Sequence, residues 1–144
     1  MPAEFFSHQV SIPRGVDHVW AQLNEVDTWA HIGPVDNVSD PVYDDDGLAS
    51  FRWSTSVGPR SFQGTAVRDE FTEMERMSFI LDAGEMTGSI STELDADDEA
   101  TELVVTLGIE AKGLLSSMFF GVIRDAVGRG LPAQVDEFAH RIGA

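Results

Sequence analysis

The stretch "SIPRGVDHVWAQLNEVDTW", from Ser11 to Trp29, changes its pattern twice and sets the order of the elements around it. It opens as the end of an alternating segment and breaks at Pro13. Beyond Gly15 the apolar residues recur at the spacing i, i+3, i+4 and i+7, which predicts one face of a short helix: Val16, Val19, Trp20 and Leu23. A turn that carries the second tryptophan follows. The stretch therefore predicts a strand, a short helix and a turn, in that order.

Apolar and polar residues alternate in the segments on either side of this stretch. With one apolar and one polar face, such segments are typical of an antiparallel sheet that is solvated on one side. Turn signals such as "YDDDG" and "DADDEA" separate the runs. Gly64 interrupts one run, which indicates a bulge or a close approach by another group. The candidate strands are residues 4–12, 37–43, 48–57, 60–71, 76–81, 88–94 and 102–111.

The C-terminal segment from Gly113 onward has helical periodicity. Its first apolar stripe reaches Ala126, and Val135, Phe138 and Ile142 continue the pattern in a rotated position. Pro132 lies between the two halves and predicts a kink or a break, because proline lacks an N–H and crowds the preceding turn. We therefore predict one α+β domain over residues 1–144. It is a curved antiparallel sheet of six or seven strands wrapped on a long, kinked C-terminal helix, with one or two short helices after the first strand.

Composition limits the classes of partner. The chain has 25 acidic and nine basic residues and a net charge of −16, which disfavours nucleic acid and anionic membranes. A saline cytoplasm and a basic protein partner both remain open as reasons for this charge. No apolar run approaches the ~18 residues of a membrane helix, and the N-terminus lacks the features of a signal peptide. We expect a cytoplasmic protein without membrane insertion.

Residue types also limit the chemistry. The absence of cysteine excludes disulfides, thiolate catalysis and cysteine-zinc sites. The four histidines are scattered, and "DDDG" lacks the glutamate that a calcium-binding EF-hand loop needs. We therefore expect no metal and no cofactor.

The order of elements resembles the SRPBCC superfamily, the START-like or helix-grip group that includes polyketide cyclase-like proteins. The resemblance rests on the opening stretch, on "DADDEATELVVTLGIEAKG" as the last hairpin and on "KGLLSSMFFGVIRDAVGRGLP" as the long helix. In the opening stretch five residues occupy the usual places: Pro13, Val19, Trp20, Asp27 and Trp29. "AHIGPVDNV" departs from the pattern, because it lacks the second aromatic residue that often follows. We therefore expect a different cavity mouth.

The resemblance implies a deep apolar cavity between the sheet and the terminal helix. Relatives bind lipids, sterols, polyketides or other planar hydrophobic molecules there, and some are cyclases or hydrolases. We expect a small hydrophobic or amphipathic ligand in a cavity of at least ~300 Å³, the low end for ligand pockets. For Trp20 core packing is favoured; for Trp29 the core and the cavity mouth are both open. The predicted lining residues are Trp29, Phe51, Trp53, Phe62, Phe79, Ile90, Leu107, Phe119, Val122 and Ile123.

Two other functions stay open. A cyclase, dehydratase or hydrolase would need polar groups in the cavity to move protons, and the candidates are His8, Arg68 and Glu110. Each also fits a structural role, His8 in the core or at an edge and the other two on the outer face. No catalytic constellation is visible, so the sequence favours a binding protein. The third reading is an interaction module whose partner recognises the acidic surface.

Overall fold

The computed structural model describes residues 3–32, 35–57, 60–84, 86–112 and 120–143, and its side chains are described over these ranges except for Val57, Arg60 and Ile123. The predicted order of elements is confirmed. The elements are β1 (Ala3–Ile12), α1 (Val16–Leu23), the 3-10 helix η1 (Val26–Ala30), β2 (Asn37–Asp44), β3 (Gly47–Val57), β4 (Arg60–Thr72), β5 (Arg76–Asp82), β6 (Met86–Asp97), β7 (Ala100–Ala111) and α3 (Phe120–Gly143).

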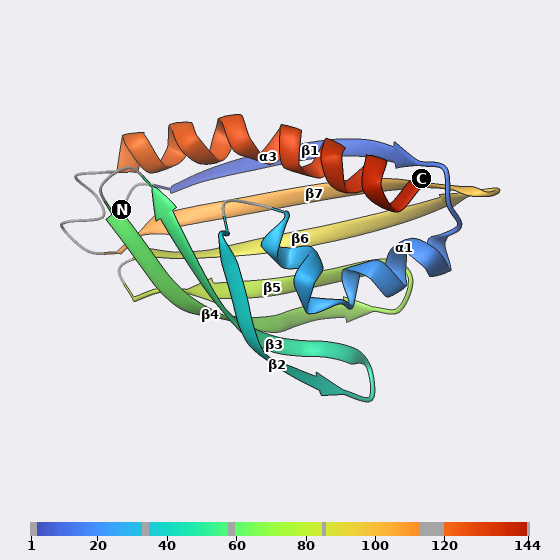
Figure 1. Cartoon of the computed structure of the whole chain (residues 1–144), viewed down its shortest axis with the longest axis horizontal. Helices are drawn as coiled ribbons and strands as arrows, with labels where there is room; N and C mark the ends of the chain where they lie inside the picture. Colours follow the sequence, from blue (N-terminus) through green and yellow to red (C-terminus); the bar gives the residue numbers. More distant parts are fainter. Residues whose placement is uncertain (1–2, 33–34, 58–59, 85, 113–119, 144) are drawn as a thin grey trace.

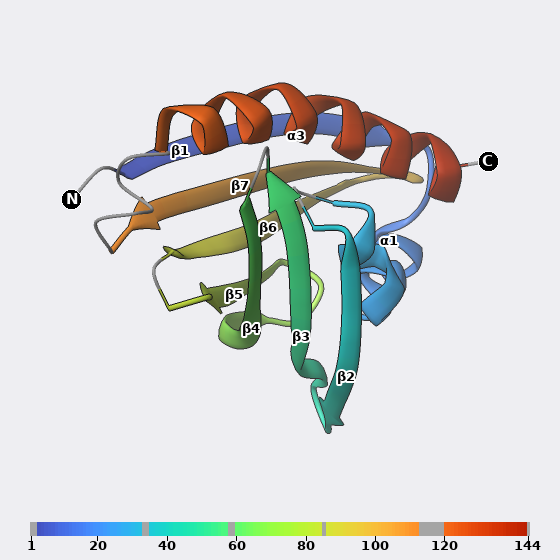
Figure 2. The ribbon, with the colours of Figure 1, turned by 60° about the vertical axis from the view of Figure 1, so that its left-hand side comes forward.

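The seven strands form a single antiparallel sheet in the order β1-β7-β6-β5-β4-β3-β2. Figure 1 shows this sheet curving beneath α3, and Figure 2 shows the same arrangement from the side. Every neighbouring pair is consecutive in the chain except β1 and β7. The predicted sheet of six or seven strands is therefore confirmed at seven, with the first strand paired to the last.

The long helix α3 packs chiefly against β1 and also touches β3 and β7. The helix is continuous through Pro132, so the predicted break does not occur. Its buried side chains form one uninterrupted stripe: Val127, Leu131, Val135, Phe138 and Ile142. Of the two predicted stripes, the second is buried at Val135, Phe138 and Ile142, whereas Val122 of the first is exposed. No helix among the described residues is both long enough and apolar enough to cross a membrane.

Aromatic residues hold the short N-terminal helices to the sheet. The Trp20 ring of α1 lies 5.7 Å from the Phe71 ring of β4, centroid to centroid. Trp20 is buried, which agrees with its expected role in packing α1 onto the sheet. Gly64 in β4 meets the expectation of a close approach. A Cβ atom added there would lie 2.2 Å from the Asp82 carbonyl oxygen and 2.8 Å from the Trp53 ring.

Candidate hydrophobic ligand site

Two small apolar cavities lie on the inner face of the sheet, the larger beside Val127 of α3 and the smaller beside Trp29 of η1. The larger has a volume of about 60 Å³ and is lined by Val35, Trp53, Thr55, Phe62, Leu81, Met86, Thr87, Gly88, Leu107, Ile109 and Val127. The smaller has a volume of about 20 Å³ and is lined by Trp29, Ile32, Val35, Phe51, Trp53, Leu81, Ile90 and Leu107. They share the residues Val35, Trp53, Leu81 and Leu107. We call the two cavities together the interior seam.

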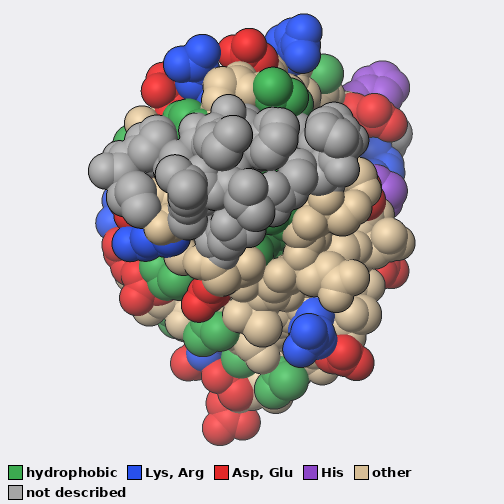
Figure 3. Space-filling view, turned by 90° about the vertical axis from the view of Figure 1, so that its left-hand side faces the viewer, with side chains coloured by type: hydrophobic (Ala, Val, Ile, Leu, Met, Phe, Trp, Pro, Cys, Tyr) green, Lys and Arg blue, Asp and Glu red, His purple; other side chains and the backbone are tan. Residues whose placement is uncertain are grey.

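The alternation of each strand explains the lining. Strands β3, β5 and β7 end at this side of the molecule, where β4, β6 and α3 begin (Figure 1). Each strand turns every second side chain inward. Figure 3 faces this end and shows hydrophobic side chains among atoms of other kinds, with charged groups mostly toward the rim. The seam therefore forms where residues from five strands meet Val127 of α3 and the residues in and after η1.

The seam is much smaller than the expected cavity. Its larger part, at about 60 Å³, is far below the ~300 Å³ at which ligand pockets begin. The expectation of an open cavity is wrong for the part of the chain that the structure describes. The reason is that large side chains from both short helices and the sheet enter the space, as in an ordinary close-packed core.

Trp29 is the clearest example of this filling. It is 2% exposed, and its indole Nε1 donates a hydrogen bond to the Leu23 carbonyl oxygen at 2.9 Å. Its ring lies 5.2 Å from the Phe79 ring and 6.4 Å from the Phe51 ring. Of the two readings left open by the sequence, Trp29 therefore takes the core position, with one edge on the smaller cavity.

Solved structures with the same arrangement are numerous, whereas no protein-family model and no curated protein sequence matches the chain. The ZhuI aromatase/cyclase from a Streptomyces species aligns over 98% of this chain and 94% of its own, with a TM-score of 0.76 and 18% identity. A START superfamily protein from Mycobacterium smegmatis aligns over 88% of this chain and 96% of its own, with a TM-score of 0.62 and 12% identity. The chain has the helix-grip fold.

A third helix-grip structure, a protein from Thermus thermophilus, aligns over 96% of this chain and 97% of its own at a TM-score of 0.77 and 12% identity. At such identities the likeness shows the fold alone. It confirms the fold class that the sequence resemblance implied. Residue roles and the identity of any ligand are not carried over by it.

The helix-grip fold brings six of the predicted lining residues to the seam: Trp29, Phe51, Trp53, Phe62, Ile90 and Leu107. Phe79 is buried behind them and lines neither cavity. Val122 does not belong to the lining, because it is 51% exposed and lies off the buried stripe of α3. Phe119 lies outside the described residues, and the side chain of Ile123 is also not described. The role of the six as ligand contacts stays a prediction.

Sequence reasoning missed several lining residues, and for some of them a signal was present. Leu81 and Ile109 belong to the same alternating faces as Phe79 and Leu107, so the period of the strand could have added them. Val127 is one turn beyond Ile123 on α3. No periodic pattern covers Val35, and Met86 precedes the predicted start of its strand. Only knowledge of the tertiary structure places these two at the seam.

The seam contains few polar groups. Thr55 and Thr87 are the residues with polar side chains in the described lining of the larger cavity, whose surface is almost wholly apolar. The Trp53 indole Nε1 is not free for a ligand, because it donates to the Thr65 carbonyl oxygen at 2.9 Å. Among the described residues, no group of three or more potential ligands could hold a metal ion. Shape and desolvation are therefore what this lining offers a bound molecule.

The three polar candidates for catalysis are not brought together. His8 Nε2 lies 2.8 Å from the Asp136 Oδ1 atom, on the side where β1 meets α3. Arg68 lies at the β2–β3 hairpin, and Glu110 pairs with Lys112, whose ammonium lowers the pKa of the Glu110 carboxyl. None of the three lines the seam. This placement does not support catalysis in the cavity by these three residues together.

Arg68 instead fixes the β2–β3 hairpin to β4. It is only 13% exposed, and its guanidinium binds both carboxylate oxygens of Asp44. It also donates to the Leu48 carbonyl oxygen at 3.1 Å and lies 5.0 Å above the Phe71 ring. The hydrogen bond from Arg68 is the largest influence on Asp44 and lowers the pKa of its carboxyl.

Replacing Arg68 by methionine is expected to raise the pKa of Asp44 toward the ordinary value of about 3.9, because the hydrogen-bonded cation is lost. In the wild-type protein the lowered pKa stabilises the folded state above pH ~3.9, and this contribution is lost as the pH falls through the lower folded value. A carboxyl-carbon NMR titration measures both proteins. Asp97, exposed in another turn, is the control carboxyl, and an unchanged Asp44 midpoint would contradict the assignment.

Proposed function

We propose that the protein binds a small hydrophobic or amphipathic molecule, of lipid-, polyketide- or aromatic-like character, between the sheet and α3. The observation that carries the proposal is the lining of the interior seam, which is apolar except for two threonine side chains among its described residues. Apolar walls with few polar anchors are typical of small-molecule sites. The fold supports it, because similar structures include a START superfamily protein and an aromatase/cyclase.

Binding in this seam requires side chains to move. The walls are close-packed and the present cavities hold only a few atoms. Met86 and Leu81 border the space at the strand ends, and methionine adapts readily because its side chain is unbranched and flexible. The ligand-bound state is then a more open conformation that the ligand stabilises by its preferential affinity. Desolvation of the ligand favours binding, and the packing contacts that the protein loses when it opens oppose binding.

The lining favours binding over catalysis. A cyclase moves protons next to a carbonyl group, and histidine or carboxylate side chains ordinarily carry that step. Thr55 and Thr87 are the residues with polar side chains in the described lining, and neither is a histidine or a carboxylate. The pair by itself does not supply an acid and a base.

A matched pair on β7 tests the proposal. Leu107 and Leu103 are both fully buried on the same face of the strand, but only Leu107 lines the seam. Replacement of either by alanine is expected to destabilise the fold by about 2–5 kcal/mol. Leu107→Ala alone enlarges the seam. It should therefore bind the neutral fluorescent hydrophobe 1-N-phenylnaphthylamine about tenfold more tightly than Leu103→Ala, because the probe displaces fewer packed atoms when it enters the enlarged space.

Fluorescence titration gives the two dissociation constants, and thermal unfolding confirms that both variants are folded at the titration temperature. Equal affinity of the two variants for the probe would contradict a binding site at the seam. Native mass spectrometry of protein purified from its own host supplies the natural ligand. The expected result is an added mass that a matched extraction with organic solvent removes.

A further inference from the structure

The outer edge of β1 is open to another strand. Among the residues that the structure describes, β1 is at the end of the sheet and pairs with β7 alone. In an antiparallel pair, alternate residues of the edge strand turn their N–H and C=O groups away from the partner. Among the described residues, the polar contact that joins β1 to α3 is the side-chain bond between His8 and Asp136. The outward backbone groups of β1 are therefore available to a new partner.

The two edges of the sheet differ in their protection. The β2 edge carries Pro41, a left-handed Asp40 with φ of 51° and two register shifts against β3. Proline, irregularity and charge are the usual means of preventing strand addition. β1 has none of these features: it pairs with β7 without a shift over all its ten residues, and Glu4 is its only carboxylate or ammonium-type charge. A regular and nearly uncharged edge is unusual on a chain with a net charge of −16.

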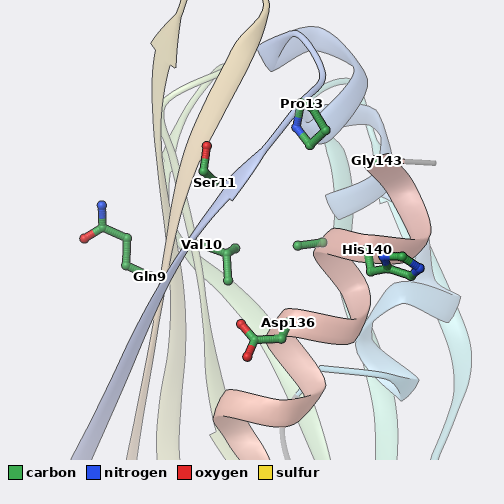
Figure 4. Close-up of a pocket in the computed structure, with 8 residues that line it drawn as sticks. Gln9, Val10, Ser11, Pro13, Asp136, His140 and Gly143 are labelled. Carbon is green, nitrogen blue, oxygen red and sulfur yellow. The ribbon is translucent and has the colours of Figure 1, made fainter.

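A channel between this edge and α3 gives such a strand a place. A groove of about 580 Å³ is lined by Gln9, Val10, Ser11 and Pro13 on one side and by Asp136, Ala139, His140 and Gly143 on the other. Figure 4 shows Val10 and Asp136 pointing into the space between β1 and α3, with Gln9 turned away. A second groove, of about 370 Å³, continues along the same strand at Glu4 and Phe6.

The helix walls of the two grooves belong to one face of α3. Asp125, Gly128 and Arg129 line the second groove, and Asp136, Ala139 and His140 line the first. These residues follow one another at helical spacings of three, four and seven, so they share a side of the helix. The two grooves therefore follow one another along the same side of the helix, and the His8–Asp136 bond joins strand to helix at the first of them. We call the two grooves together the channel.

We propose that this channel binds an extended peptide segment of a basic partner protein, which adds to β1 as an eighth strand of the sheet. Backbone hydrogen bonds to the free edge of β1 supply affinity, as in other cases of strand addition. The charge of −16 attracts a basic chain over a long range. A second copy of this chain is disfavoured, because it brings the same net charge. The site is independent of the interior seam and of any ligand there.

The two faces of the added strand meet different surroundings. On the convex face, the Phe5 ring is 72% exposed and lies across Gly108, so an apolar cross-strand neighbour would cover it. On the other face, Asp136 borders the first groove, whereas Asp125 in the second groove is accompanied by Arg124 and Arg129. Since strand side chains alternate, the preferred segment has apolar residues at every second position and lysine or arginine on its other face where it passes Asp136.

A capped synthetic peptide of alternating valine and lysine, about as long as β1 with its ten residues, tests this proposal. Titration into ¹⁵N-labelled protein is expected to shift the amide signals of β1 and to protect alternate β1 amides from hydrogen exchange. Two further peptides carry N-methyl groups on all valines or on all lysines, so each has one blocked edge. One of these two should retain binding and the other should lose it, because only one edge faces β1.

A matched pair of charge reversals locates the site. Asp136→Lys is expected to weaken binding about fivefold, whereas Asp45→Lys, with the same change in net charge in the β2–β3 turn at the opposite edge of the sheet, should weaken it less than about twofold. Equal binding of both methylated peptides, or equal effects of the two reversals, would show general attraction to an acidic surface and overturn the proposal. Protection of β1 amides on concentrating the protein alone would overturn it in favour of a second copy.

Discussion

Replacing Trp29 by alanine is expected to lower the free energy of unfolding by about 3–5 kcal/mol. The indole is almost completely buried and packs against the rings of Phe51 and Phe79. Its removal leaves a cavity where η1 meets the sheet, and it also leaves the Leu23 carbonyl without its donor. Urea unfolding followed by circular dichroism measures the loss.

Trp29→Phe separates the two contributions. It keeps an aromatic ring in the core but removes the Nε1–H donor, so the expected loss is smaller, about 1–2 kcal/mol. Tyr43→Ala is the control, because Tyr43 is an exposed aromatic residue on β2 and its replacement should change stability by about 0.5 kcal/mol or less. A loss below about 1 kcal/mol for Trp29→Ala would mean that the indole is a removable cover of the seam rather than part of the core.

Phe138→Ala is expected to have an effect of similar size, about 3–5 kcal/mol. Phe138 is fully buried in the stripe by which α3 meets the rest of the protein, and the Arg141 guanidinium lies 5.7 Å from its ring centroid. The expected consequence is loss of the helix from the sheet at lower denaturant concentration. Amide exchange of α3 against that of β5 shows whether the helix is released first or with the whole domain.

Val122→Ala is the matched control on the same helix. Val122 is half exposed and lies away from the stripe, so its truncation should change stability by less than about 0.5 kcal/mol. If Val122→Ala instead costs as much as Phe138→Ala, the assignment of the inner face of α3 is wrong. The pair thus tests the feature on which both the seam and the channel depend.

The sequence was sufficient for the architecture because period is a local property. Phe6, His8, Val10 and Ile12 share the inner side of β1 as their alternation predicts. The spacing of Val19, Trp20 and Leu23 fixed the buried face of α1. The pairing of β1 with β7 was not predicted, because no local pattern joins segments so far apart in the chain.

The face of α3 and the volume inside the sheet were harder to predict. Val122 continues a local stripe that is apolar enough to be buried, but the helix has one orientation, and Val127, Leu131 and Val135 determine it. Cavity volume depends on the rotamers of large residues from several elements at once. Trp29 illustrates this point, since its sequence position fitted both the mouth and the core, and packing against Phe79 decided it.

The antiparallel pairing of β1 with β7 has a consequence for how the molecule is made. Ser7 and Thr106, which face each other across that pair, are 99 positions apart. During synthesis β1 leaves the ribosome before the other strands, and its neighbour β7 is made only after all the strands between them. The hairpins from β2 to β7 can form as each strand is made, whereas the pairing of β7 with β1 joins the most distant segments and has the highest contact order. We expect this last pairing to limit the folding rate and to leave nascent chains most exposed to chaperones.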